Sequence, residues 1–215
     1  MKLWLASANL ERVKICLAYG VFTGVITNPH VVAQEQRDPK AIFYDLCQIA
    51  PAAYYQLRAG EVDDMLSEAE TMLAIDPQKM RIKVPATRNG LAVIRRLSDQ
   101  GLSIMATAVP TNTWMVLAVA AGAVAIAPYS GMLQRRNILP KMEGVFAMQS
   151  IIDRQGYDVE LCTGIYDATE IAQYAAQGVK SAFIWDKDVE AFLTQELADE
   201  AAANFESDWA QINAY

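Results

Sequence analysis

The stretch RIKVPATRNGLAVIRRLSDQGLSIMAT, residues 81–107, contains a complete strand–helix–strand pattern. Residues 81–84 form a short apolar run that stops at Pro85, and residues 103–107 form a second β-prone run. Between them, residues 89–100 repeat apolar side chains at three- and four-residue spacing, which is typical of an amphipathic helix. A helix between two such strands predicts a parallel pair of strands covered on one side by the helix.

The same alternation continues along the rest of the chain. Strands are expected at residues 2–5, 24–27, 53–57, 81–84, 103–107, 124–127, 158–162 and 181–184. Helices are expected at residues 9–19, 61–75, 89–100, 137–155, 167–176 and 188–209. Eight strands in strict alternation with about eight helices predict an α/β fold, the (β/α)8 TIM barrel, as a single domain over residues 1–215 with a C-terminal helix. A doubly wound open sheet is the alternative, but neither GxGxxG nor GxxxxGK[ST] occurs.

Composition narrows the class of protein. A content of 53% hydrophobic and 20% charged residues is typical of a globular chain, and the net charge of −7 argues against nucleic-acid binding. The odd, widely spaced Cys16, Cys47 and Cys162 fit neither a disulfide framework nor a metal site and indicate a reducing compartment. Residues 1–5 are too short for a signal-peptide core, and the apolar run at 115–128 is too short to span a membrane. We therefore expect a cytoplasmic protein without membrane or nucleic-acid partners.

Candidate functional residues lie where the predicted strands end, because barrel enzymes carry their chemistry at the carboxyl ends of the strands. These positions hold Ala6-Ser7, Thr27-Asn28, Gln56, Lys83, Thr107, Tyr129, Thr163-Gly164 and Trp185-Asp186. Lys83 stands between two apolar neighbours, so burial would lower its pKa and give a nucleophilic neutral amine. The alternative is a strand-end lysine that reaches solvent. A neutral polar ring around one amine favours imine chemistry.

Six motifs in order along the chain carry a family resemblance. They are Met1-x-Leu3-x-Leu5-x-x-Ala8-Asn9, Gly24-Val25-x-Thr27-Asn28-Pro29, Lys83-x-Pro85-x-Thr87 with Gly90-Leu91-Ala92-x-Ile94, Thr107-Ala108-Val109, Ala127-Pro128-Tyr129, and Phe205-Glu206-x-Asp208-Trp209. With these motifs the chain resembles the small transaldolase family, in particular its fructose-6-phosphate aldolase branch. The resemblance runs from end to end.

The resemblance implies a class I aldolase or transaldolase that acts on a small carbonyl or sugar substrate without metal or cofactor. It implies that Lys83 forms the Schiff base, that Asn28 holds substrate hydroxyls, and that Gln56, Thr107 and Tyr129 position water and move protons. The neighbouring substrate-binding candidates are Thr27, Ala6, Gly164 and Arg135. It also implies a homo-oligomeric ring, a pentamer or decamer, in which the C-terminal helix reaches a neighbour.

The chain departs from the family pattern at several of these positions. Ala6 stands where the family has an aspartate. Met132, Gly164 and Tyr166 stand where it has phosphate ligands, although Arg135 lies close by as a substitute. Two further interpretations follow from these departures. One is a catalytically impaired member that binds a carbonyl metabolite or serves as an oligomeric scaffold. The other is imine chemistry on an unphosphorylated acceptor, or in a reaction other than aldol cleavage.

His30 is the only histidine and stands where the family has a serine. A single histidine excludes a His-based metal cluster and a Ser-His-Asp triad. At a loop tip after Asn28 it is expected either to line the pocket or to be a solvated turn residue.

Overall fold

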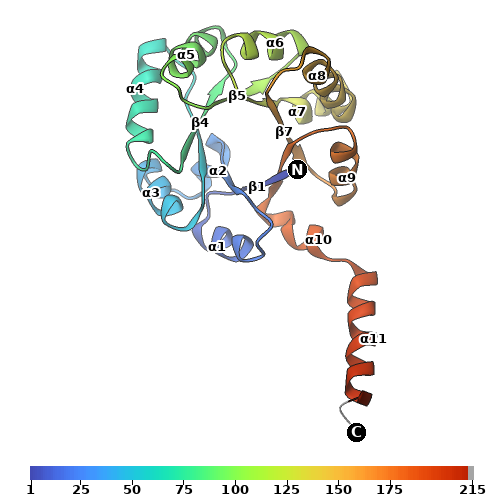
Figure 1. Ribbon diagram of the computed structural model, residues 1–215. Coiled ribbons are helices and arrows are strands. Elements are labelled where there is room, and N and C mark those ends of the chain that lie inside the picture. The colour runs from blue at the N-terminus through green and yellow to red at the C-terminus, as the bar shows by residue number, and fades with distance from the viewer. Residues whose placement is uncertain (213–215) are drawn as a thin grey trace.

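Eight parallel strands close into a barrel in the order of the sequence, in a computed structural model that describes residues 1–212 (Figure 1). The predicted (β/α)8 barrel is therefore confirmed. The strands are β1 (Lys2–Ala6), β2 (Gly24–Ile26), β3 (Ala53–Gln56), β4 (Met80–Pro85), β5 (Ile104–Val109), β6 (Ala125–Pro128), β7 (Glu160–Ile165) and β8 (Ser181–Trp185). Because all strands are parallel, their carboxyl ends open at one mouth.

Helices surround the strands, and the last of them extends away from the ring that the others form (Figure 1). They are α1 (Leu10–Ala18), α2 (Pro29–Gln34), α3 (Pro39–Ile49), α4 (Val62–Leu73), α5 (Arg88–Asp99), α6 (Asn112–Ala120), α7 (Ser130–Arg135), α8 (Lys141–Gln155), α9 (Ala168–Ala176), the 3-10 helix η1 (Asp186–Asp188), α10 (Val189–Leu193) and α11 (Glu196–Ile212). Side-chain caps on backbone N–H groups begin several of them. The capping residues are Asn9, Asn28, Asp38, Thr87, Thr111 and Asp167.

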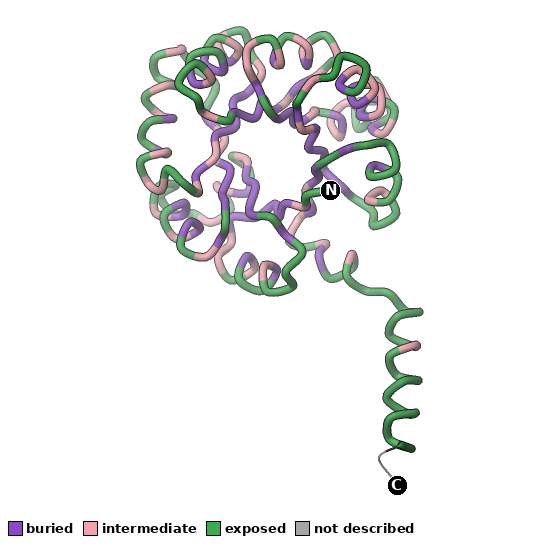
Figure 2. Tube along the Cα trace, in the orientation of Figure 1, coloured by how far each residue is buried: buried purple, intermediate pink, exposed green. Residues whose placement is uncertain are grey.

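The core has two parts. Inside the barrel, Trp4 packs edge-on against Tyr54, with ring centroids 4.9 Å apart, and Met105 and Cys162 are fully buried nearby. A larger apolar layer fills the space between the strands and the surrounding helices, where side chains leave the outer face of the sheet. Figure 2 shows this arrangement as a buried ring of strands inside helices that are exposed on their outer faces. The interior is therefore packed, as in other barrels of this type.

Two predicted helices have wrong boundaries. The helix expected at 137–155 begins only at Lys141, because Pro140 disfavours helical backbone at the residue before it, and a separate short α7 precedes it. The helix expected at 188–209 is two helices, since Thr194 adopts an extended backbone between α10 and α11.

Four helices, α2, α3, α6 and the short α7, were not among the predicted ranges. The first two begin with clear signals, Asn28-Pro29 and Asp38-Pro39, in which a capping side chain precedes a proline at the first helical position.

The last helix, α11, extends away from the barrel (Figure 1). None of its residues is buried, and Leu197, Phe205, Trp209 and Ile212 each expose more than half of their surface. Among the described helices, none is long and apolar enough to cross a membrane.

Candidate active site

Lys83 lies near the end of β4 with only 6% of its surface exposed, so it is not a lysine that reaches solvent. Its Nζ donates a hydrogen bond to the carbonyl oxygen of Thr27 at 2.8 Å. Among residues 1–212, no carboxylate forms an ion pair with this amine. Burial therefore dominates and lowers the pKa of Lys83 to about 8. Roughly a tenth of the molecules then carry a neutral amine at pH 7.

A cavity of about 500 Å³ surrounds this amine at the mouth of the barrel. It brings together most of the residues that the sequence placed at the strand ends. Those in its wall are Asn28, Gln56, Lys83, Thr107, Tyr129, Gly164 and Trp185, and Arg135 joins them from the end of α7. The volume suits a small sugar or a drug-sized ligand.

Strand register explains why the polar residues meet. Gln56 is the partner of Lys83 in the β3–β4 pair, and Thr107 is the partner of Pro85 in the β4–β5 pair. Tyr129 follows β6 directly, and its backbone N–H donates to Val109 at 2.8 Å. Parallel pairing thus carries three side chains that are far apart in sequence to one wall.

Asn28 serves the fold and the cavity at once. Its Oδ1 accepts hydrogen bonds from the backbone N–H groups of His30 and Val31 at the start of α2. The amide oxygen is occupied by this cap, so the Nδ2 group is the part of Asn28 that can donate to a ligand.

The backbone at Thr107 is irregular. A β-bulge separates Thr107 from Val109, and Ala108 between them adopts a φ of 56°. Non-glycine residues rarely take this left-handed conformation, which costs about 1–2 kcal/mol. Thr107 and Ala108 both line the cavity, so the strained residue is part of the wall.

Two predicted substrate-binding residues lie outside the cavity wall. Thr27 is buried and donates its hydroxyl to the carbonyl of Tyr54, while its own carbonyl accepts from Lys83. Ala6 is 3% exposed at the end of β1 and pairs with Trp185 on β8. The structure therefore places Thr27 as an anchor of the lysine.

The three positions that depart from the family's phosphate ligands are occupied by apolar or aromatic groups. Met132 lines the cavity, and so does Tyr166, whose hydroxyl lies against Gly131. The missing side chain of Gly164 leaves space that the ring of Phe183 fills, since a Cβ there would lie 2.9 Å from the ring. Arg135 is in the wall, so one guanidinium remains available at the mouth.

Phe183 and Lys141 are cavity residues that the sequence did not predict. Phe183 lies in β8, and its sequence context is that of an ordinary core residue of a strand. Lys141 begins α8 and is 2% exposed, and its Nζ pairs with Glu170 at 2.5 Å and lies 4.2 Å from the ring centroid of Tyr166. Burial lowers the pKa of Lys141, and the hydrogen bond that its Nζ donates to Glu170 opposes that change. Lys141 therefore differs from Lys83 in having a carboxylate partner.

Fold and site together define a (β/α)8 barrel with a buried, unpaired lysine in a polar cavity at the carboxyl ends of its strands. Residues 3–189 match the family described as Transaldolase/Fructose-6-phosphate aldolase. The chain belongs to this family.

Curated relatives agree with the family match. The chain is 29% identical over 214 residues to a probable transaldolase of Thermodesulfovibrio yellowstonii, with 99% of each chain covered. It is 30% identical over 214 residues to a probable transaldolase of Alkaliphilus metalliredigens, covering 97% of this chain and 98% of the relative. It is also 30% identical to a protein named probable transaldolase 2 of Bacillus anthracis, with 98% of each covered. These similarities indicate a transaldolase-type enzyme.

Proposed function

We propose that this protein is a class I aldolase or transaldolase that forms a Schiff base between Lys83 and a small ketone or ketose. The observation that carries the proposal is the buried amine of Lys83, whose pKa is lowered to about 8 and which lies in the wall of the mouth cavity. Such an amine is a nucleophile toward carbonyl carbon near neutral pH. The family match supports the same chemistry class.

The proposed reaction uses groups that share the cavity. The neutral amine of Lys83 adds to the ketone carbon, and loss of water gives the iminium ion. Removal of a proton from the neighbouring carbon gives an enamine, which attacks the carbon of an aldehyde. Water then returns the amine and releases the product. Tyr129 and a water held by Gln56 and Thr107 are assigned the proton transfers, and Asn28 donates to a substrate hydroxyl.

Borohydride reduction in the presence of hydroxyacetone tests this proposal. Mass spectrometry is expected to place the reduced adduct on the peptide containing Lys83, and its rate of formation should rise as pH increases through about 8. Lys83→Met should abolish the adduct, whereas the control Lys14→Met, at an exposed lysine paired with Glu11, should retain it. An adduct on the buried Lys141 would refute the assignment.

We further propose that phosphate recognition is weak. The support is the substitution of Met132, Gly164 and Tyr166 at the inferred contacts, with the ring of Phe183 filling the space beside Gly164. A charge-assisted hydrogen bond contributes roughly 1.5–3 kcal/mol, so its loss should remove most of the preference. We expect kcat/KM for glyceraldehyde 3-phosphate to exceed that for glyceraldehyde by less than about tenfold, equivalent to about 1.4 kcal/mol. A larger ratio would show that Arg135 supplies the missing contact.

Ala6 favours a second candidate function. Without a carboxylate at the end of β1, the protein could bind a carbonyl metabolite on Lys83 and release it with little turnover, or serve mainly as a scaffold. Adduct formation without aldol turnover of any hydroxyketone–aldehyde pair would support the binding function. Turnover at ordinary rates would exclude it.

We also propose that the protein assembles with copies of itself through α11, in the cytoplasm. The support for assembly is the exposed apolar series Leu197, Phe205, Trp209 and Ile212, which has spacings of eight, four and three residues and so follows one face of the helix. The support for a reducing compartment is that Cys16, Cys47 and Cys162 are buried and unpaired.

A further inference from the structure

A second cavity, of about 410 Å³, lies beside the one that contains Lys83. The two cavities have four lining residues in common, so they meet at the mouth of the barrel. The shared residues are His30, Arg135, Tyr166 and Trp185. We call the second cavity the annex, and its own wall consists of Ser7, Ala8, Val31, Gln34, Glu35, Asp186, Lys187 and Asp188.

The annex differs from the Lys83 cavity in its chemistry. Three carboxylates line it, those of Glu35, Asp186 and Asp188, against the cations of Lys187 and the shared Arg135. Gln34 and His30, whose side chains lie 3.3 Å apart, add further polar groups. Carboxylate oxygens accept hydrogen bonds from hydroxyl groups and repel a phosphate dianion. The wall therefore suits a neutral chain of hydroxyl groups.

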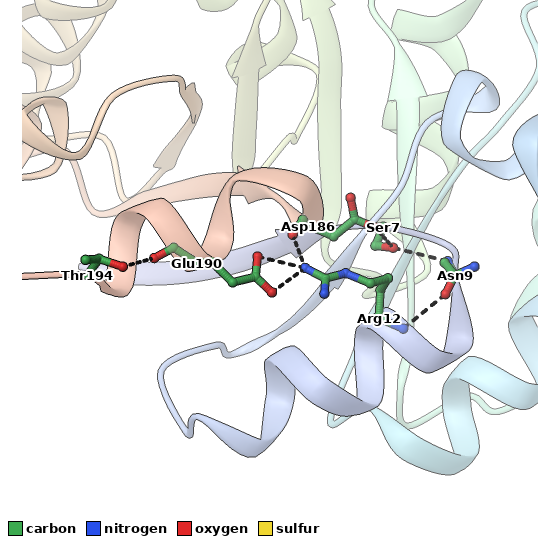
Figure 3. Close-up of polar contacts among 6 residues, drawn as sticks. All are labelled: Ser7, Asn9, Arg12, Asp186, Glu190 and Thr194. Atoms are coloured by element: carbon green, nitrogen blue, oxygen red, sulfur yellow. Dashed lines mark hydrogen bonds and ion pairs between the residues drawn. The ribbon is translucent and has the colours of Figure 1, made fainter.

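Two of these carboxylates are held in place by the fold. Oδ2 of Asp186 accepts the hydroxyl of the buried Ser7 at 2.5 Å, and Oε2 of Glu35 accepts the amide of Asn9 at 3.2 Å. Arg12 fixes the turn after β8 by donating to the backbone carbonyl of Asp186 at 2.6 Å (Figure 3). In the described part of the chain, the other oxygen of each carboxylate accepts no hydrogen bond from protein. Both are thus positioned acceptors with capacity for a ligand.

We infer that the annex binds the hydroxylated tail of a neutral aldose acceptor whose aldehyde end reaches Lys83. This inference rests on the proposed function, because the acceptor meets the enamine in the Lys83 cavity. A two-carbon acceptor ends inside that cavity, whereas an acceptor of four or more carbons extends past Arg135 and Tyr166 to the carboxylates. The annex thereby selects acceptors by length and by absence of charge.

The test compares acceptors of different length with hydroxyacetone as the donor. For wild type, kcat/KM is expected to be higher for erythrose than for glycolaldehyde. Asp186→Asn and Glu35→Gln should each lower that ratio about fivefold or more, the effect of one lost hydrogen bond of about 1 kcal/mol. Asn and Gln keep an acceptor oxygen for Ser7 and Asn9, so both variants should fold. Asp199→Asn, at an exposed acid in α11, makes the same charge change as a control.

A ratio that stays the same in both variants, or a wild type that prefers glycolaldehyde, would overturn the inference. Binding of erythritol, measured by saturation-transfer NMR, probes the annex without any reaction. It should be weakened by Asp186→Asn and retained by Lys83→Met. Glycolaldehyde turnover without erythritol binding would refute the annex and leave the proposed function standing. Erythritol binding without a borohydride adduct on Lys83 would refute the proposed function and leave the annex standing.

Discussion

A buried lysine without a carboxylate partner lowers the stability of the fold that holds it. For Lys83, a pKa lowered from 10.5 to about 8 corresponds to a cost of about 3 kcal/mol below pH 8. The hydrogen bond to the Thr27 carbonyl returns about 1 kcal/mol of this. Lys83 therefore lowers the stability of the fold, which is typical of a residue at a functional position.

Lys83→Met should accordingly stabilise the protein by about 2 kcal/mol at pH 7. Between pH 8 and 10.5 only the unfolded chain keeps the lysine proton, so wild-type stability rises with pH and the advantage of the variant should vanish near pH 10. Urea unfolding at pH 7 and pH 10 measures this. A variant that is less stable than wild type at pH 7 would show that the hydrogen bond outweighs the desolvation.

Ala6→Asp should raise aldol turnover by tenfold or more, within the ~10²–10⁴-fold range of general acid–base catalysis. The position ends β1 and is buried beside the Trp185 strand, where a carboxylate would favour the cationic imine. Ala6→Asn has the same shape without the charge and serves as the control. Equal turnover in wild type and both variants, with the fold intact, would show that the site is adapted to different chemistry.

The sequence predicted individual site residues unevenly. Lys83, Gln56 and Thr107 were predictable because strand periodicity and a parallel barrel fix which residues end at the mouth. Lys141 was not predictable, because the ion pair that accompanies its burial involves Glu170, a partner 29 positions away that no local pattern reveals. Phe183 enters the wall only because Gly164 lacks a side chain.

At the level of helices and strands, the junction of β4 and α5 depends on one glycine. A Cβ at Gly90 would lie 1.9 Å from the carbonyl oxygen of Pro85, the last residue of β4. This close approach seats α5 against the strand end two residues beyond Lys83. The geometry of the lysine thus depends on the first turn of the following helix.

Gly90→Ala should therefore destabilise the protein by at least about 2 kcal/mol, because the clash is with backbone that cannot rotate away. Gly60→Ala is the matched control, since no heavy atom lies within 4 Å of its added Cβ. Chemical unfolding of both variants gives the comparison. If both lose the same stability, the contact at Pro85 is not what restricts position 90.

Whole elements were easier to predict than their ends. All eight strands were expected within a few residues, because buried β-prone runs between turns are distinctive. The interruption at Thr194 was not expected, because α10 and α11 each have a helical pattern. Only the extended backbone at Thr194 separates the two helices.

On the scale of the whole molecule, α11 is the part that the barrel leaves uncovered. Its apolar side chains project beyond the ring of helices, as Figure 1 shows for the helix as a whole. Burying Phe205 and Trp209 against another copy would contribute about 1.5–3 kcal/mol for each side chain. A free monomer would leave this surface in water.

Phe205→Glu combined with Trp209→Glu should therefore shift the protein from an oligomer to a monomer in sedimentation analysis. Glu200→Lys, an exposed charge change in the same helix, controls for altered charge. A wild type that sediments as a monomer would refute assembly through α11. So would a double variant whose oligomer stays intact.

The contact between Gly164 and Phe183 determines the order in which these two positions can change without a clash. A small polar residue such as serine at position 164 would place its Cβ 2.9 Å from the Phe183 ring, so the ring must shift while that phenylalanine remains. Replacing Phe183 first with a smaller residue leaves a void that a later serine can fill. The two positions are thus coupled, and of the two orders in which they could change, only the one that replaces Phe183 first avoids a displaced ring.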